Sequence, residues 1–71
     1  MDKYKYIVVN KVLDKTLVLG FKSKKVMFEV VSGLLPCGGT PTLMDYSMYQ
    51  YSDDYKELRD SNPEIIDYTT F

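Results

Sequence analysis

Hydrophobic and polar residues alternate in three runs within the first 32 residues, and a period of two predicts β-strands. The first run covers residues 4–9, where the alternation is least regular. In the other two runs every second residue is apolar, and these side chains are expected on the buried face: Leu17, Leu19, Phe21, Val26, Phe28 and Val30. Polar connections are predicted at 10–15 and 22–25. The pattern therefore predicts a three-stranded β-meander.

The next segments are a loop and an ambiguous stretch. Residues 33–41 contain three glycines and two prolines, which break both helix and strand and predict a loop. Residues 42–51 fit two interpretations. An alternation typical of a strand involves Met44, Tyr46 and Met48, whereas a helical spacing involves Met48, Tyr51, Tyr55 and Leu58. Both interpretations remain open.

A helix is predicted over residues 53–60. Ser52 is a favourable N-cap, and Asp53 and Asp54 suit the positive end of the helix dipole. Asn62-Pro63 is a stop signal, after which residues 64–70 alternate weakly, as in a final strand. The predicted fold class is α+β: a small antiparallel sheet, built on a three-stranded meander that C-terminal strands can extend, packed with one short C-terminal helix.

The composition limits the chemistry. With 71 residues and 45% hydrophobic content, the chain fits one small domain over residues 1–71, with no room for a large substrate cavity beside a core. There is no histidine and a single cysteine, Cys37, which excludes histidine-based nucleophilic sites, thiolate zinc sites and an internal disulfide. We expect no enzyme activity, no metal and no cofactor. Cys37 is interpreted as a structural or incidental thiol.

The length of the apolar runs predicts where in the cell the protein is found. The longest are four residues or fewer, far below the ~20 needed to span a bilayer, and the N-terminus lacks a signal-peptide core. We therefore expect a soluble cytoplasmic protein with no membrane partner.

Charge is distributed unevenly along the chain. Residues 1–41 hold seven lysines against three acidic residues, a net charge of +4, whereas residues 42–71 hold two basic residues against seven acidic ones, a net charge of −5. The chain thus divides into a basic β-meander at 1–32, a Gly/Pro loop at 33–41 and an acidic half at 42–71. Such asymmetry bears on partners more than on fold.

The acidic half carries the candidate binding residues. On a helical wheel Asp53, Glu57 and Asp60 fall within about 60° of one another, with Tyr55 and Leu58 opposite, so the carboxylates should face solvent. Successive carboxylates on this stripe are ~6 Å or less apart along the axis, similar to backbone phosphates. Five of the seven tyrosines lie in this half, and tyrosine is frequent at binding hot spots. The predicted partner-binding residues are Asp53, Asp54, Glu57, Asp60, Glu64, Asp67, Tyr49 and Tyr51, with Tyr49 expected to be exposed.

Two other interpretations do not depend on the acidic half. A small β-sheet bearing lysines and the aromatic residues Tyr4, Tyr6 and Phe21 is typical of single-stranded nucleic-acid binding. The absence of arginine before Arg59 and the position of the lysines in turns count against it. Homodimerisation through an exposed sheet edge is a third, structural interpretation.

The acidic, tyrosine-rich composition of residues 42–71, in a short chain without catalytic groups, resembles that of small phage-encoded inhibitors that mimic the charge of DNA. The resemblance implies a protein that acts in the host bacterial cytoplasm and occupies the nucleic-acid site of a host protein, without binding nucleic acid itself. Targets implied by such families are a histone-like nucleoid protein, a restriction or CRISPR effector, or RNA polymerase. A basic clamp of the histone-like class best matches an acidic face of this size.

Overall fold

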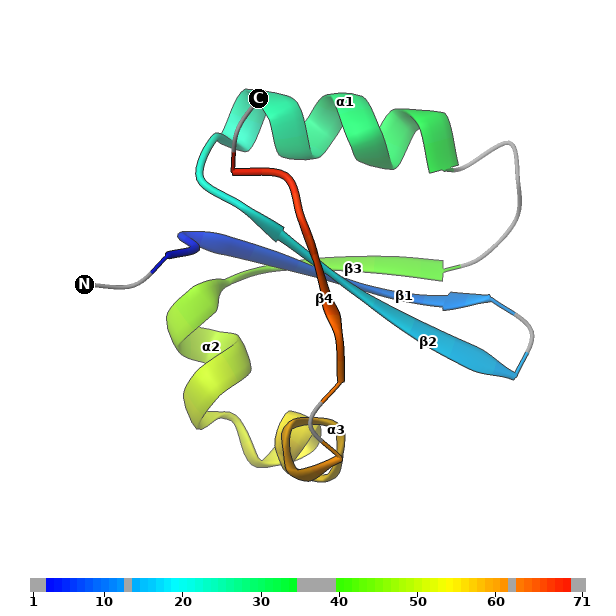
Figure 1. Cartoon of the computed structure of the whole chain (residues 1–71), viewed down its shortest axis with the longest axis vertical. Coiled ribbons are helices and arrows are strands. Elements are labelled where there is room, and N and C mark those ends of the chain that lie inside the picture. The colour runs from blue at the N-terminus through cyan, green and yellow to red at the C-terminus, as the bar shows by residue number, and fades with distance from the viewer. Residues whose placement is uncertain (1–2, 13, 35–39, 62, 70–71) are drawn as a thin grey trace.

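The computed structural model describes residues 3–12, 14–34, 40–61 and 63–69, and in this part of the chain a four-stranded sheet lies between two layers of helices (Figure 1). The elements in chain order are β1 (Tyr6–Val12), β2 (Lys15–Phe21), α1 (Lys24–Leu34), β3 (Thr40–Asp45), α2 (Tyr46–Tyr51), the 3-10 turn η2 (Asp53–Tyr55), α3 (Lys56–Asp60) and β4 (Ile65–Asp67). The α+β class predicted from the sequence is confirmed, but the sheet is mixed and not antiparallel throughout, and helices besides the predicted C-terminal one pack on it.

The sheet is mixed, with strand order β3-β1-β2-β4. β1 pairs antiparallel with β2 and β3, and β4 pairs parallel with β2. The connection through α1 leads from β2 to β3, and the connection through α2 and α3 leads back across the sheet to β4. Because crossovers between parallel strands are almost always right-handed, two connections that cross in opposite directions place their helices on opposite faces. Figure 1 shows this arrangement, with α1 on one face and α2 and α3 on the other.

Each face of the sheet has its own core. Alternate residues of β1 point to opposite faces, so Val8 packs toward α1 while Ile7 and Val9 pack toward α2 and α3. The core on the α1 face contains Val8, Leu19, Phe21, Met27 and Val31. The core on the other face contains Ile7, Val9, Val18, Met44 and Tyr49. Burial on both faces explains why the apolar run in β1 alternates poorly in the sequence.

The predicted third strand of the meander is wrong, because its residues form α1. Ser23 caps this helix, its Oγ accepting a hydrogen bond from the Val26 amide at 3.4 Å. The side chains that pack on the sheet follow a helical spacing: Val26, Met27, Val30 and Val31. Phe28, expected on the buried face of a strand, is instead 50% exposed.

Other expected boundaries also shift. Asn10, assigned to a connection, lies inside β1 and is buried. The first two residues of the expected loop at 33–41 belong to α1, and its last two belong to β3. Residues 35–39, with Cys37, lie outside the described residues. The ambiguous stretch 42–51 holds both elements, since β3 ends at Asp45 and α2 starts at Tyr46.

The C-terminal elements follow the sequence more closely. The predicted helix at 53–60 exists as η2 followed by α3, and the weak final strand is β4. No helix in the described segments has both the length and the apolar character needed to cross a membrane.

Candidate protein-binding surface

The acidic side chains of η2 and α3 form one end of the molecule, which we call the acidic end: Asp53, Asp54, Glu57 and Asp60. All four residues are exposed, while Tyr55 and Leu58 of the same segment pack against the core below. Ser52 holds the start of η2, its Oγ accepting a hydrogen bond from the Asp54 amide at 3.3 Å. The helical wheel therefore predicted correctly which side chains of residues 53–60 are exposed.

Basic side chains form no ion pair with the carboxylates of the acidic end in the described part of the chain. Among the described residues the only ion pair joins Lys3 to Asp67, at 2.7 Å. Lys56 is exposed on α3 without a carboxylate partner in that part of the chain. Arg59 turns inward, where its Nη1 donates to the backbone carbonyls of Tyr49 at 2.5 Å and Ser52 at 2.7 Å. Its charge thus stabilises the junction of α2 and η2 and does not pair with the carboxylates.

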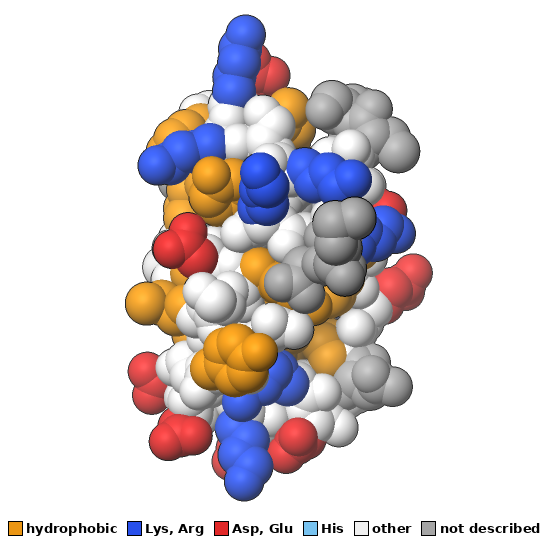
Figure 2. Space-filling view, turned by 90° about the vertical axis from the view of Figure 1, so that its left-hand side faces the viewer, with side chains coloured by type: hydrophobic (Ala, Val, Ile, Leu, Met, Phe, Trp, Pro, Cys, Tyr) orange, Lys and Arg blue, Asp and Glu red, His pale blue; other side chains and the backbone are white. Residues whose placement is uncertain are grey.

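Charge is segregated along the molecule. Figure 2 shows acidic side chains around the lower end, where η2 and α3 lie, with basic side chains between them, and lysines gathered toward the upper end. The lysines near the start of α1 are Lys22, Lys24 and Lys25, all exposed. On the face shown, lysines are therefore more frequent toward the upper end, and acidic side chains are more frequent around the lower end.

Two of the predicted carboxylates are placed differently from the other four. Glu64 is exposed just before β4 and extends the acidic end toward the sheet. Asp67 closes β4 and is engaged: besides Lys3, it accepts hydrogen bonds from the Thr69 amide at 2.8 Å and the Thr69 hydroxyl at 2.6 Å. Asp67 therefore forms a clamp with Lys3, an ion pair that ties the N-terminal segment to β4, and its carboxylate is not free to bind a partner.

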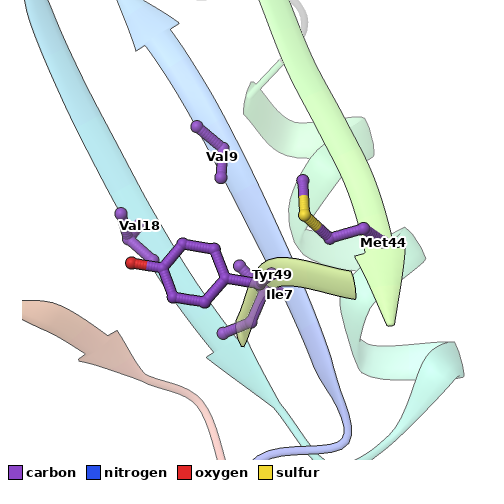
Figure 3. Packing of buried hydrophobic residues seen from close by; sticks show 5 residues of the cluster. All are labelled: Ile7, Val9, Val18, Met44 and Tyr49. Atoms are coloured by element: carbon purple, nitrogen blue, oxygen red, sulfur yellow. The ribbon is translucent and has the colours of Figure 1, made fainter. Parts of the chain in front are cut away.

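The prediction for Tyr49 is wrong. Its side chain is 5% exposed, and its ring lies over Ile7 and Val18 of the sheet (Figure 3). Because α2 starts at Tyr46, the helical spacing points Tyr46 and Tyr49 inward together, with ring centroids 6.5 Å apart. Burial also raises the pKa of the Tyr49 hydroxyl. Tyr49 is thus a core residue and cannot contact a partner.

Tyr51, in contrast, is available. As the last residue of α2, directly before the acidic end, it is 79% exposed. An exposed aromatic ring beside a row of carboxylates combines an apolar anchor with charged contacts, which is typical of binding sites. The sequence did not reveal that Met48 is also exposed, because residues 42–51 could be assigned neither to a strand nor to a helix.

The described part of the chain contains no group of three His, Cys, Asp or Glu side chains placed to hold a metal ion. No protein-family model, curated protein or solved structure matches the chain. The surface must therefore be interpreted from its own chemistry, which is that of exposed carboxylates with an adjacent tyrosine.

The clamp between Lys3 and Asp67 predicts a pH-dependent contribution to stability. The Lys3 ammonium and the two Thr69 donors hold the pKa of Asp67 far below its usual range, and the carboxylate raises the pKa of Lys3. A depressed carboxylate pKa stabilises the fold above the unfolded value of about 3.9, and this contribution is lost as the pH falls through the folded pKa. The Asp67→Asn variant should therefore be less stable than the wild type at neutral pH, and the difference should disappear in strong acid.

Urea denaturation of both proteins across this pH range measures the difference. Thr69→Ala serves as a control that removes the threonine hydroxyl and leaves Lys3 in place. A wild-type advantage over Asp67→Asn that stays constant down to the lowest pH would show that the carboxylate charge is not involved.

Proposed function

We propose that this chain is a non-catalytic binding protein whose acidic end occupies the DNA-binding site of a basic protein and excludes DNA from it. A histone-like nucleoid protein in a bacterial cytoplasm is the favoured partner class. The observation that carries the proposal is the acidic end itself: four exposed carboxylates have no ion-pair partner among the described residues, while the nearby Arg59 is turned toward backbone carbonyls.

Three features of the structure support this function. Glu57 and Asp60 lie three residues apart in α3, ~4.5 Å along its axis, and Asp53 and Asp54 lie in the 3-10 turn directly before it, so η2 and α3 present closely spaced negative charges, as a phosphate backbone does. Tyr51 adds a protruding ring at one side of this row. Glu64 continues the charge beyond α3. Asp67 and Tyr49 are excluded from the proposed contact because both are engaged within the fold.

The alternative, single-stranded nucleic-acid binding on the sheet, has less support. Base stacking on a sheet needs exposed aromatic rings on an open face. Here Phe21 is fully buried, stacked on Tyr68 with centroids 5.0 Å apart, and helices cover both faces of the sheet. Phe21 is therefore unavailable for stacking, and the described sheet has no face that is free of helices.

A displacement assay tests the proposal. A labelled duplex DNA is bound to a purified histone-like nucleoid protein, the chain is added, and fluorescence anisotropy reports release of the DNA. We expect release by the wild type, weakening as salt rises because the Debye length falls from about 10 Å at 0.1 M to about 3 Å at 1 M.

Matched charge reversals identify the surface. Glu57→Lys/Asp60→Lys should raise the concentration needed for release by about tenfold or more, since each reversal replaces an attraction by a repulsion. Asp14→Lys/Glu29→Lys changes the net charge equally at exposed positions outside the acidic end and should release DNA like the wild type. Equal loss in both variants, or no release by the wild type, would refute the proposal. An anisotropy increase when the chain meets DNA alone would support the nucleic-acid-binding alternative.

A further inference from the structure

The free edge of β3 offers a second binding surface, independent of the acidic end. β3 lies at one side of the sheet and, among the described strands, pairs with β1 alone. The Tyr46 amide donates to the Lys5 carbonyl at 2.9 Å, which fixes the alternation of the ladder. Every second residue of β3 before Tyr46 therefore points its backbone N–H and C=O toward β1, namely Met44, Thr42 and Thr40. The residues between them point these groups outward, namely Asp45, Leu43 and Pro41. Pro41 fits this assignment, because proline in a strand is tolerated where no ladder donor is needed.

The outer edge of β3 presents few backbone hydrogen-bonding groups. The donors are the amides of Leu43 and Asp45, since Pro41 has none. The acceptors are the carbonyls of Pro41 and Leu43, because the carbonyl of Asp45, the N-cap of α2, accepts the first hydrogen bond of that helix. The edge thus presents two donors and two acceptors.

This set is complementary to itself in one register. If two β3 strands pair antiparallel about Leu43, the two Leu43 residues exchange both of their hydrogen bonds. Each Asp45 amide then faces the Pro41 carbonyl of the other copy, so every free donor and acceptor is used. Sliding the strands by two residues in either direction leaves half of these groups unpaired. In one direction the Leu43 amide faces the Asp45 carbonyl, which is already bonded within α2. In the other direction the Leu43 carbonyl faces Pro41, which has no amide hydrogen.

An apolar groove of about 340 Å³ lies along the same edge. Its lining includes Lys24 and Phe28 of α1, Leu43 and Asp45 of β3, and Met48 of α2. Phe28 of α1 is 50% exposed and Met48 of α2 is 58% exposed, so large apolar side chains from the helices on both faces of the sheet remain uncovered beside β3. Exposed apolar surface next to unpaired backbone groups is typical of an interface.

The charges on the groove also suit a second copy. Lys24, at the start of α1, and Asp45, at the end of β3, both lie at the end of the groove where β3 finishes. Antiparallel pairing sends these ends in opposite directions, so like charges of the two copies stay apart. We propose that two copies of this chain associate through β3, antiparallel about Leu43, and join their four-stranded sheets into one continuous sheet.

Oligomeric state and a matched pair of variants test the interface. Light scattering should give twice the 8.2 kDa of one chain at high concentration and the mass of one chain on dilution. Phe28→Lys should raise the dimer dissociation constant by about tenfold or more, because it places a charge in the apolar interface. Leu17→Lys makes the same change at an exposed apolar residue of β2 and should not alter dimerisation. Circular dichroism checks that both variants fold.

Cysteine cross-linking tests the register. In a Cys37→Ser background, Leu43→Cys should form an intermolecular disulfide on mild oxidation, since facing Cα atoms in a hydrogen-bonded pair are about 5.5 Å apart. Asp45→Cys should not, because the two positions would lie roughly 13 Å apart along the strands. A monomer at every concentration overturns the proposal, as does cross-linking of Asp45→Cys in preference to Leu43→Cys.

Discussion

Replacing Arg59 by methionine should lower the free energy of unfolding by about 2–3 kcal/mol, since hydrogen bonds from a charged donor contribute roughly 1.5–3 kcal/mol each. Arg59 donates to the carbonyls of Tyr49 and Ser52, at 2.5 and 2.7 Å. These carbonyls belong to the last turn of α2 and to the residue that follows it, where intrahelical donors are missing. Methionine retains much of the aliphatic volume but leaves both acceptors without this partner.

Lys56→Met is the matched control for this prediction. It removes the same charge from the same helix, but Lys56 is exposed, and surface substitutions usually change stability by less than about 0.5 kcal/mol. Arg59→Lys should fall between the two, because lysine keeps a charged donor, but its shorter side chain places the ammonium nitrogen short of the position from which Nη1 of Arg59 reaches both carbonyls. Urea denaturation midpoints compare the three variants. Equal midpoints for Arg59→Met and Lys56→Met would show that the inward hydrogen bonds do not stabilise the fold.

The exposed carboxylates were predictable because they depend on local structure. Ser52 and the stop at Pro63 bracket a short helical segment, and the positions of Tyr55 and Leu58 then determine its buried face. Asp67 belongs to the same acidic run, but its partner Lys3 lies at the other end of the chain. A contact between two ends of the sequence depends on the path of β4 beside β2, which no local pattern encodes.

The errors at α1 and Tyr49 have a common physical origin. Val26, Val30 and Val31 favour strands by their intrinsic propensity, yet this segment must cross from β2 to β3, which run parallel, and such a crossover is usually helical. Tyr49 points inward because the chain changes from strand to helix at Tyr46. In both cases tertiary structure outweighed a local pattern that fits strand and helix almost equally well.

The proposed surfaces adjoin on α2, which carries Met48 of the groove and Tyr51 beside the acidic end, but the β3 edge and the carboxylates belong to different elements. The β3 edge and its groove involve α1, β3 and α2, while the acidic end involves η2 and α3. A dimer joined through β3 would carry two acidic ends, and a partner with two basic sites could then bind both at once. Linked sites strengthen binding without any new contact, provided the geometry lets both engage. Phe28→Lys would therefore weaken displacement of DNA from such a partner, although it leaves every carboxylate of the acidic end unchanged.

Substituting Gly20 by alanine should destabilise the protein by about 1–3 kcal/mol, the usual cost of overpacking a filled site. Gly20 lies in β2, and a Cβ atom there would overlap the Tyr4 ring. The ring covers the glycine and packs edge-on against Tyr46, with centroids 6.0 Å apart. Alanine would therefore force the Tyr4 ring off the sheet and away from the core below α2.

A double-mutant cycle separates this steric effect from strand propensity. In a Tyr4→Ala background the ring is absent, so Gly20→Ala should become neutral or slightly stabilising, and the coupling between the two sites should be 1 kcal/mol or more. Gly33→Ala is the control for glycine removal itself: among the described residues, no atom outside its own stretch of helix lies within 4 Å of the added Cβ, and alanine within a helix should stabilise α1 by about 0.5–1 kcal/mol. If Gly20→Ala is equally destabilising with and without Tyr4, the Tyr4 ring is not the reason why position 20 needs glycine. A strong coupling would instead show that the N-terminal segment is held to the sheet by Tyr4 as well as by the pair of Lys3 with Asp67.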